Sequence, residues 1–430
     1  MFDDVDRRVL VLALARAADS VANSFIIILV PIYIASQSIS LAGLTGIEVF
    51  GVTLTEQFYI GIVLSLFGLI NSFLQPFTGT LSDRVERRRV FVLAGLAIIA
   101  VSSALYPFVT TYLGVLAIRG IQGIGAAFTI PATVALVNEF SAGDGRGESF
   151  GVFNTLRLVG FGVGPILAGA VYQFGPYQTP VGTVPGLDAA FMVAVVGATL
   201  GFGLVTWFVT DPPGVATHEA DDDSMETGGF SFLDPAGISR INPVIVLGIG
   251  TFLLAGAISM FTPLEGPVTA RLNESSFLFS LQFSIGVLAT IIFQVPAGRA
   301  SDIYGRRPTI LAGFVVLVPS MIAQGVVTTP IGMFIARFVL GAAFAAVFAP
   351  SLALAGDLAG DRSGSTLAIL TGAFGLGIAL GPISAGFLFS LGSYSTPFFV
   401  GGAFAVLATL LVFLEVYEPE RIERDLAADD

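Results

Sequence analysis

The chain has 430 residues, of which 54% are hydrophobic and only 12% are charged. Soluble domains carry about 25% charged residues, so this composition excludes an ordinary soluble protein. The absence of cysteine excludes disulfides, thiol catalysis and thiolate metal sites. The one histidine, His218, stands among acidic residues in a polar stretch, where a solvated side chain is expected rather than a ligand.

The charge balance is unusual, because the net charge is −12 and all 19 basic residues are arginine. A GC-rich genome would favour arginine, alanine and glycine on its own. Acidic, lysine-free surfaces also suit proteins in concentrated salt, where screening reduces self-repulsion. We therefore hypothesise a halophilic source, and unimpaired folding and activity in low salt would contradict it.

Long apolar runs recur along the chain and are separated by short polar breaks. A helix needs about 20 apolar residues to cross a membrane, whereas barrel strands are alternating segments of about ten. These runs do not alternate, which predicts an all-α membrane protein with twelve transmembrane helices. The first run follows Arg7 and Arg8 and is too long for a signal-peptide core, so a retained helix is expected. The expected spans are 9–35, 57–80, 90–108, 112–138, 149–174, 188–210, 243–268, 277–298, 309–327, 330–355, 366–391 and 396–416.

Arginine placement predicts the orientation. Most arginines fall in loops or flanks on one side, and only Arg271 falls in a loop on the other. We expect a multi-pass protein of the cell membrane with the arginine-rich side and both termini in the cytoplasm. Residues 211–242 break the pattern with an acidic stretch and are expected to be a cytoplasmic linker. It would join a six-helix half at 1–210 to a second half at 243–430, which ends in a short cytoplasmic tail.

Two patterns recur between these halves at nearly one offset, which predicts a parallel repeat. The first pattern contains Gln75, Gly79, Ser82, Asp83, Arg87 and Arg88, which recur 219 positions later as Gln294, Gly298, Ser301, Asp302, Arg306 and Arg307. The second pattern contains Gly160, Gly164, Pro165 and Gly169, which recur as Gly377, Gly381, Pro382 and Gly386.

The first pattern resembles the signature loop of the major facilitator superfamily, and the helix count extends the resemblance over essentially the whole chain. Glu86 departs from the family's usual glycine, which the second copy keeps as Gly305. The resemblance implies that Asp83 contacts the start of the eleventh helix in the outward-open state and that breaking this contact permits inward opening. The alternative is a cluster that only holds the loop inside. The candidate gating residues are Gly79, Asp83, Arg84, Arg87 and Arg88, with Gly298, Asp302, Gly305, Arg306 and Arg307 in the second copy.

The glycine–proline pattern of the fifth expected helix resembles the family's antiporter motif. Gly160, Gly164 and Gly169 lie close to one helix face and permit tight helix contact. Pro165 removes a backbone hydrogen bond and is expected to bend the helix. The same pattern in the second half favours plain packing as much as antiport.

Charges inside membrane helices are costly and usually functional. Asp19 falls near the middle of the first helix, and Arg119 in the fourth helix is placed at a similar depth. Arg119 with Gln122 and Gly123 resembles the family's motif in that helix, which implies a role in proton transfer. We expect Asp19 to bind the proton. The alternative is a static pair, with Arg119 or with Arg16 one turn earlier.

The resemblance places the first, fourth, seventh and tenth helices around a central substrate cavity. Its candidate polar lining is Asn23, Ser24, Gln122, Ser259, Thr262, Glu265 and Arg337. Arg157 in the fifth helix is a further candidate, with the inner loop as its alternative place. Glu265 has an alternative place at the membrane interface, because Pro263 and Gly266 flank it.

These features favour a secondary transporter that exports a small apolar or cationic molecule in exchange for protons. The alternative is proton- or sodium-coupled symport of a sugar, organic acid or nucleoside. A membrane sensor or a lipid scramblase is less favoured. An enzyme is not expected, because the sequence offers no nucleophile–base constellation and no phosphate-binding loop. No cofactor, metal or nucleic-acid partner is expected, and we expect a monomer in the bilayer.

Overall fold

The computed structural model describes residues 6–418 except 37, 38, 40, 42, 45, 50, 86, 142–145, 181, 212–231, 235, 236 and 360–362. Glu86, His218, most of the expected linker and the C-terminal tail therefore lie outside the described residues.

Twelve helical segments among the described residues are long and apolar enough to cross a membrane, which confirms the predicted all-α class. The first six arise from α1 (Arg7–Ala35), α2 (Glu56–Val85), α3 (Arg88–Ala104) with the 3-10 turn η1 (Tyr106–Phe108), α4 (Tyr112–Phe140), α5 (Arg146–Phe174) and α6 (Gly186–Phe208). Two small hairpins join helices at one end: β1 (Glu48–Val49) with β2 (Val52–Thr53), and β3 (Tyr177–Thr179) with β4 (Gly182–Val184).

The second six arise from α7 (Pro243–Ser259) with α8 (Glu265–Leu272), α9 (Ser276–Tyr304), α10 (Arg306–Val326), α11 (Pro330–Ala359), α12 (Ser363–Ser390) and α13 (Thr396–Glu415). The expected span at 243–268 is confirmed as Pro243–Leu272, but it is not one regular helix. A 3-10 turn, η4 (Thr262–Leu264), separates α7 from α8 within this span. Pro263 in the turn has no N–H to donate, so regular helical hydrogen bonding is interrupted there.

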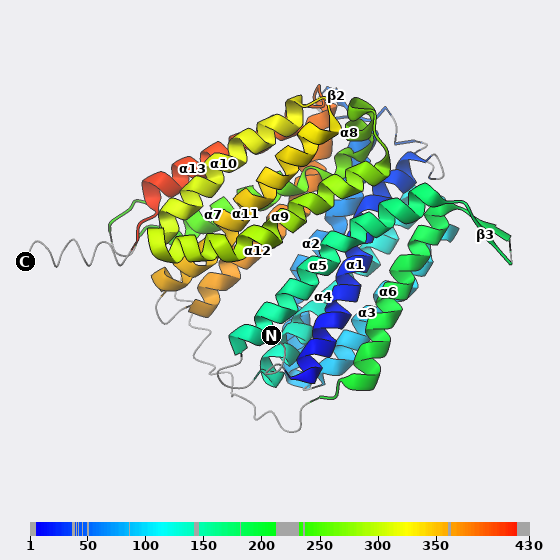
Figure 1. The fold of residues 1–430 in the computed structure, drawn as a ribbon, viewed down its shortest axis with the longest axis horizontal. Helices are drawn as coiled ribbons and strands as arrows, with labels where there is room; N and C mark the ends of the chain where they lie inside the picture. The colour runs from blue at the N-terminus through cyan, green and yellow to red at the C-terminus, as the bar shows by residue number, and fades with distance from the viewer. Residues whose placement is uncertain are drawn as a thin grey trace, which may run out of the picture.

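The twelve spans form two bundles of six with matching contacts, and Figure 1 shows the two bundles beside each other. In the first bundle α1 packs on α5 and α6, α4 packs on α2 and α3, and α3 also packs on α6. In the second, α7 packs on α12 and α13, α11 packs on α9 and α10, and α10 also packs on α13. Each contact in one half thus has a counterpart in the other, as a parallel repeat requires.

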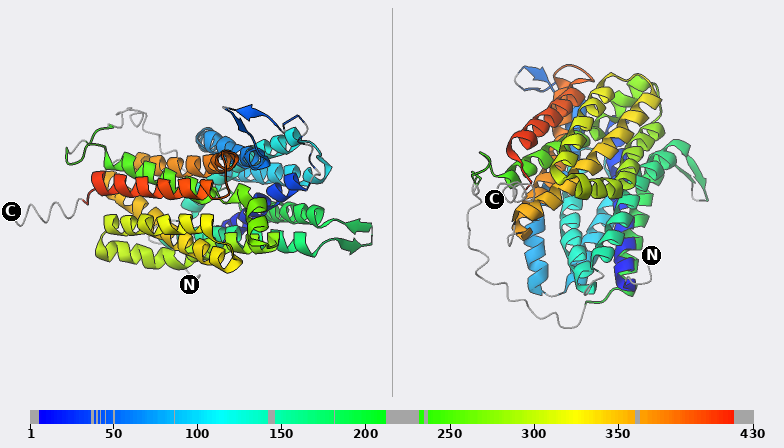
Figure 2. Two further views of the ribbon diagram at one scale, coloured as in Figure 1. Left: turned by 90° about the horizontal axis from the view of Figure 1, so that it is seen from above. Right: turned by 60° about the vertical axis from the view of Figure 1, so that its left-hand side comes forward.

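The two bundles meet through α2 with α12 and through α5 with α9. They lie side by side at the end that carries the hairpins and α8, and they diverge toward the end where α1 begins (Figures 1 and 2). Close backbone approaches occur along the joined part: a Cβ added at Gly386 would lie 2.3 Å from the Gln57 carbonyl oxygen. Near the other end, a Cβ added at Gly151, Gly298 or Gly372 would meet no atom of the described residues within 4 Å. The halves are therefore closed at the hairpin end and apart at the arginine-rich end.

Candidate functional site

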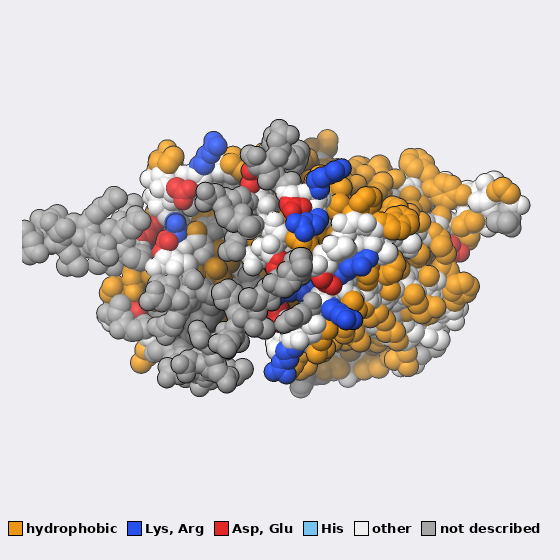
Figure 3. Space-filling model, turned by 90° about the horizontal axis from the view of Figure 1, so that it is seen from below, with side chains coloured by type: hydrophobic (Ala, Val, Ile, Leu, Met, Phe, Trp, Pro, Cys, Tyr) orange, Lys and Arg blue, Asp and Glu red, His pale blue; other side chains and the backbone are white. Residues whose placement is uncertain are grey.

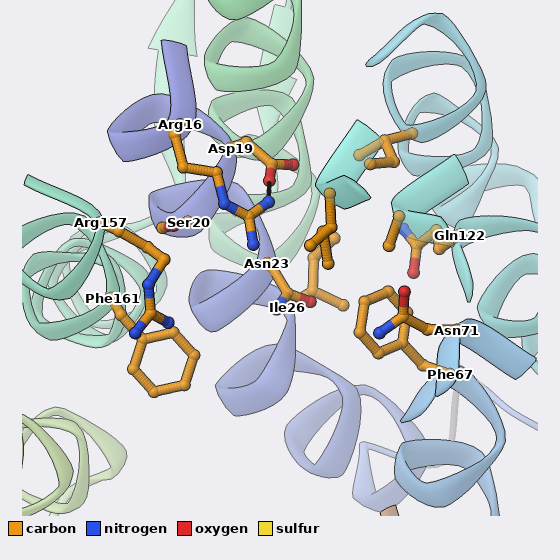
Figure 4. A pocket seen from close by; sticks show the side chains of 13 residues that line it. Arg16, Asp19, Ser20, Asn23, Ile26, Phe67, Asn71, Gln122, Arg157 and Phe161 are labelled. Atoms are coloured by element: carbon orange, nitrogen blue, oxygen red, sulfur yellow. Dashed lines mark hydrogen bonds and ion pairs between the residues drawn. The ribbon is translucent and has the colours of Figure 1, made fainter. Parts of the chain in front are cut away.

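A cavity with about 630 Å³ of empty space, partly open to its surroundings, lies among α1, α2, α4 and α5 (Figure 4). The structure brings together four residues that the sequence singled out as site candidates: Asp19, Asn23, Gln122 and Arg157. It adds lining residues that were not predicted, among them Ser20, Phe67, Asn71 and Phe161. Asn71 had a signal, since it is an amide inside an apolar run, whereas nothing distinguished these two phenylalanines among 38.

Asp19 and Arg16 form an ion pair on α1 beside this cavity. Arg16 Nη1 donates to Asp19 Oδ2, and Asp19 is only 5% exposed. The two residues are three positions apart, so one turn of helix brings their side chains together. Both side chains reach the cavity wall (Figure 4). A buried carboxylate needs such a partner, because an unpaired charge in a low-dielectric environment is costly.

Arg119 lies behind the cavity wall and takes partners other than Asp19. Its guanidinium donates from Nη1 to Gln122 Oε1 at 3.0 Å and lies 4.6 Å from the centre of the Phe67 ring. Gln122 also donates to Ser103 Oγ at 3.0 Å and accepts from the Tyr106 hydroxyl at 3.3 Å. Gln122 and Phe67 both line the cavity. Arg119 thus reaches the cavity through these two side chains, and Asp19 takes the local alternative, Arg16.

Arg157 reaches the cavity from α5. Its Nε and Nη2 donate to Asn154 Oδ1 at 3.1 and 2.9 Å, and among the described residues no carboxylate pairs with it. In Figure 4 its guanidinium lies beside the Phe161 ring. Since Arg16 and Arg157 face one carboxylate, Asp19, the cavity carries a formal charge of +1.

The candidates of the second half lie outside this cavity. Arg337 is 4% exposed and lies 4.2 Å from the Phe261 ring centre and 5.7 Å from that of Phe283. Its Nε donates to the Gln282 carbonyl at 3.4 Å. Glu265 begins α8 and accepts a hydrogen bond from Ser276 Oγ at 2.6 Å.

Two serines expected in the cavity lie in helix contacts instead. A Cβ added at Gly164 would lie 2.1 Å from Ser24 Oγ, and one at Gly381 would lie 1.9 Å from Ser259 Oγ. Ser24 donates to the Ser20 carbonyl, and Ser259 donates to that of Gly256. Their hydroxyls are satisfied by their own helix, which leaves them suitable as small packing residues. Thr262, the first residue of η4, donates to the carbonyl of Ser259 at the end of α7.

The repeated glycines divide their contacts in the same way in both halves. A Cβ at Gly160 would lie 2.3 Å from the Ala17 carbonyl oxygen of α1, and one at Gly377 would lie 2.4 Å from that of Phe252 of α7. The third glycine of each set faces the other half: Gly169 approaches Ser280 of α9, and Gly386 approaches α2. Both α5 and α12 continue past Pro165 and Pro382, so the expected bends remain predictions.

The signature residues lie at the arginine-rich end, where charged side chains gather beside a hydrophobic flank (Figure 3). The first of these residues belong to a helix and not to a loop. The helix α2 continues to Val85 and includes Gly79, Asp83 and Arg84. Asp83 pairs with Arg88 at 3.0 Å, and Arg88 also pairs with Glu139 at 2.8 Å.

In the second copy Arg306 pairs with Asp357, and Asp302 lies in the last turn of α9. Gly305 joins α9 to α10 with φ of +105°, a conformation that favours glycine. Arg87 precedes α3 at its N-cap position, and Arg307 is the second residue of α10. A Cβ at Gly79 would lie 3.7 Å from Pro131.

Comparison with known proteins agrees with this architecture. NorA, the quinolone resistance protein of Staphylococcus aureus, is 22% identical over 364 residues, which cover 83% of this chain and 87% of NorA. An uncharacterized MFS-type transporter of Methanocaldococcus jannaschii is 31% identical over 121 residues, 28% of this chain and 31% of that protein.

Among solved structures, a bacterial homolog of the human lysosomal transporter Spinster, in an inward-facing and occupied conformation, has a TM-score of 0.75 at 14% identity. That match covers 94% of this chain and 95% of the other. The human organic anion transporter MFSD10 has a TM-score of 0.63 at 20% identity and covers 94% and 99%. These likenesses show the fold. The model of the Major Facilitator Superfamily matches residues 12–265 and again 247–429, so this chain belongs to that family of transporters, which are not enzymes.

Proposed function

We propose that this chain moves a small molecule by alternating access and couples that movement to a proton carried by Asp19. The observation behind the proposal is the buried Arg16–Asp19 pair beside the cavity (Figure 4). A proton on Asp19 would neutralise the partner of Arg16 and raise the formal charge of the cavity from +1 to +2. Protonation therefore changes what the cavity attracts, which is the requirement for coupling.

The leading substrate class is a small apolar or cationic molecule moved out of the cell. Phe67 and Phe161 supply aromatic surface in the cavity, and NorA, a quinolone resistance protein, matches most of the chain. A cationic substrate would compete with the proton, since each disfavours the other through charge repulsion. Such competition leads to exchange, and the repeated glycines that let α5 pack closely on α1 fit the antiporter motif they resemble.

A second candidate is symport of an organic acid, and Arg157 favours it. This guanidinium reaches the cavity without a carboxylate partner among the described residues. A carboxylate substrate and the proton on Asp19 would bind cooperatively, because protonation frees Arg16 for the anion. Symport of sugars or nucleosides, with protons or sodium, is a weaker form of this alternative.

Because the two halves are apart at the arginine-rich end, the cavity would face the cytoplasm of the cell membrane under the arginine rule. We further propose that the chain acts as a monomer with both termini and the linker inside. The two halves would rock about the α2–α12 and α5–α9 contacts to expose the cavity to the opposite face.

The test is proton flux in sealed vesicles that contain the purified protein. Lipophilic cations and aromatic carboxylates are added in turn to vesicles with a preset proton gradient. Exchange predicts that a cation collapses the gradient through wild type and not through Asp19→Asn. Symport predicts that a carboxylate carries protons inward and that Arg157→Gln abolishes this flux.

The matched control is Glu48→Gln, which removes an exposed carboxylate in a hairpin and should leave both fluxes unchanged. Equal fluxes in wild type and Asp19→Asn would refute coupling through Asp19.

A further inference from the structure

A second group of carboxylates lies in the other half, at the hairpin end and outside the cavity. Glu265 begins α8, and Glu274 follows the end of the same helix. Gln282 in α9 donates from Nε2 to Glu274 Oε2 at 2.7 Å, and Ser276 Oγ donates to Glu265 Oε1 at 2.6 Å. The two acids therefore share one junction, between α8 and α9.

This junction has more acceptors than donors. Glu274 Oε1 and Gln282 Oε1 are both buried and have no hydrogen-bond partner among the residues that the structure describes, and Gln282 as a whole is 0% exposed. Among the described residues, neither Glu265 nor Glu274 forms an ion pair. A buried acceptor without a donor is costly, so the arrangement lacks a positive or hydrogen-bond-donating group.

The nearby charged and titratable groups are engaged elsewhere. Arg271 of α8 donates to the carbonyls of Val326 and Val327 and lies 4.6 Å from the ring centre of Tyr394. Tyr394 donates its hydroxyl to the Gln324 carbonyl. From α11, Arg337 donates to the backbone of Gln282, not to its side chain. From α1, which also contacts α8, Tyr33 donates to backbone carbonyls of its own half.

We propose that Glu274, with Glu265 and Gln282, forms a second proton-binding site, in the half opposite to Asp19 and at the hairpin end. A proton from water adds to a Glu274 oxygen and forms an O–H group that donates where only acceptors now stand. It also removes one of two neighbouring negative charges. The transporter would then carry one proton site in each half. This goes beyond the proposed function and does not depend on Asp19.

The protonation equilibrium of Glu274 fits this role. Burial and the negative charge of Glu265 raise its pKa to about 7, against the opposing hydrogen bond from Gln282. Both forms of Glu274 are therefore populated near neutral pH. An ordinary solvated glutamate side chain, in contrast, is ionised throughout that range.

The test is infrared difference spectroscopy of the full chain in lipid nanodiscs, titrated from about pH 5 to about pH 9. The carboxyl C=O stretch of a protonated acid reports each proton directly and needs no substrate. We expect a band that disappears with a midpoint near 7 in wild type and persists in Asp19→Asn and Glu48→Gln. Glu274→Gln should lack this band, and its persistence there would overturn the proposal.

Two further variants keep the test decisive if Glu274→Gln does not fold. Glu265→Gln removes the neighbouring negative charge, so the midpoint should fall. Gln282→Leu removes the hydrogen bond that stabilises the ionised form, so the midpoint should rise. Shifts in the same direction, or none, would refute the site. Sodium added at constant ionic strength should leave the midpoint in place, whereas a lowered midpoint would show a sodium site and overturn the assignment to a proton.

Discussion

The two halves share one pattern of close helix contacts at the repeated glycines, here called the packing frame. They differ in the polar residues of their interiors. In the frame, Gly164 approaches Ser24 as Gly381 approaches Ser259, and the third glycine of each set faces the opposite half. In the interiors, the first half places the Arg16–Asp19 pair beside a cavity. The second half holds Arg337 near the Phe261 and Phe283 rings, and its carboxylates Glu265 and Glu274 lie at the hairpin end.

This difference separates what the repeat preserves from what it leaves free. Close helix approach requires small residues at fixed spacing, so the frame is tied to the sequence pattern. A polar side chain in the interior needs only one or two partners, which neighbouring residues can supply locally. The motion therefore belongs to both halves, whereas the proposed coupling chemistry is divided unequally between them.

The largest expected effect follows from locking the frame at its closed end. Thr55 Oγ1 and Ser390 Oγ lie 2.8 Å apart across the two halves. The double variant Thr55→Cys with Ser390→Cys should form a disulfide, because the two side chains already face each other, and the chain has no other cysteine. Oxidation should abolish transport of whichever compound the flux assay identifies, and reductant should restore it.

Each single cysteine variant serves as the control and should transport under both conditions. Mass spectrometry measures the fraction that is cross-linked. A fully cross-linked protein that still transports would show that the halves need not separate at this end.

Replacing a closely packed glycine of the packing frame with alanine should destabilise the protein about equally in either half. Gly164→Ala and Gly381→Ala each bring a methyl group within about 2 Å of a serine oxygen, which is far inside van der Waals contact. We expect each to lower the free energy of unfolding by about 1–3 kcal/mol, as overpacking does. Thermal unfolding in nanodiscs measures the loss.

The matched controls are Gly151→Ala and Gly372→Ala, where the added methyl group meets nothing within 4 Å in the described part of the chain. Because alanine favours helix over glycine, these should be neutral or stabilising by up to about 1 kcal/mol. A large loss in one half only would contradict the shared frame.

The sequence predicted the frame better than the interiors. Apolar runs and arginine breaks predicted all twelve spans, because membrane thickness sets helix length. Pro263, by contrast, was not recognised as the interruption between α7 and α8, although prolines such as Pro31 stand within continuous helices. Whether a proline interrupts a helix depends on tertiary partners for the freed carbonyls, which a sequence does not display.

For the site, the polar residue types were predicted and their partners were not. Asp19 was expected to be important, but whether Arg16 or Arg119 would pair with it depended on side-chain geometry. Ser24 and Ser259 were expected in the cavity, yet helix rotation turns both toward glycines. The hydrophobic periodicity of a sequence does not fix how a helix is rotated about its axis when the helix is apolar on most faces.

A smaller effect is expected where carboxylates bind the starts of two equivalent helices. Asp211 Oδ1 accepts from the Arg89 backbone N–H at 2.8 Å, and Glu418 Oε1 accepts from that of Arg307 at 2.8 Å. A negative charge at a helix N-terminus is stabilising by about 0.3–1 kcal/mol. Asp211→Asn and Glu418→Gln should each lower the free energy of unfolding by that amount. A loss above about 2 kcal/mol would mean that these contacts are not equivalent to simple helix caps.

The smallest expected effect is a difference in salt dependence between the carboxylates at helix starts, such as Asp211, and the buried carboxylate Asp19. The same measurement tests the hypothesis of a halophilic source. Raising salt from about 0.1 M to about 1 M shortens the screening length from about 10 Å to about 3 Å. The surface excess of negative charge should then repel itself less, so wild type should unfold at a higher temperature.

The loss in the free energy of unfolding caused by Asp211→Asn should shrink over the same range. A loss caused by Asp19→Asn should hardly change, because buried pairs are screened little. Thermal unfolding at both salt concentrations measures all three proteins together. An unfolding temperature that falls with added salt would contradict the halophile hypothesis, and a salt-sensitive Asp19→Asn would mean that water and ions reach the Arg16–Asp19 pair.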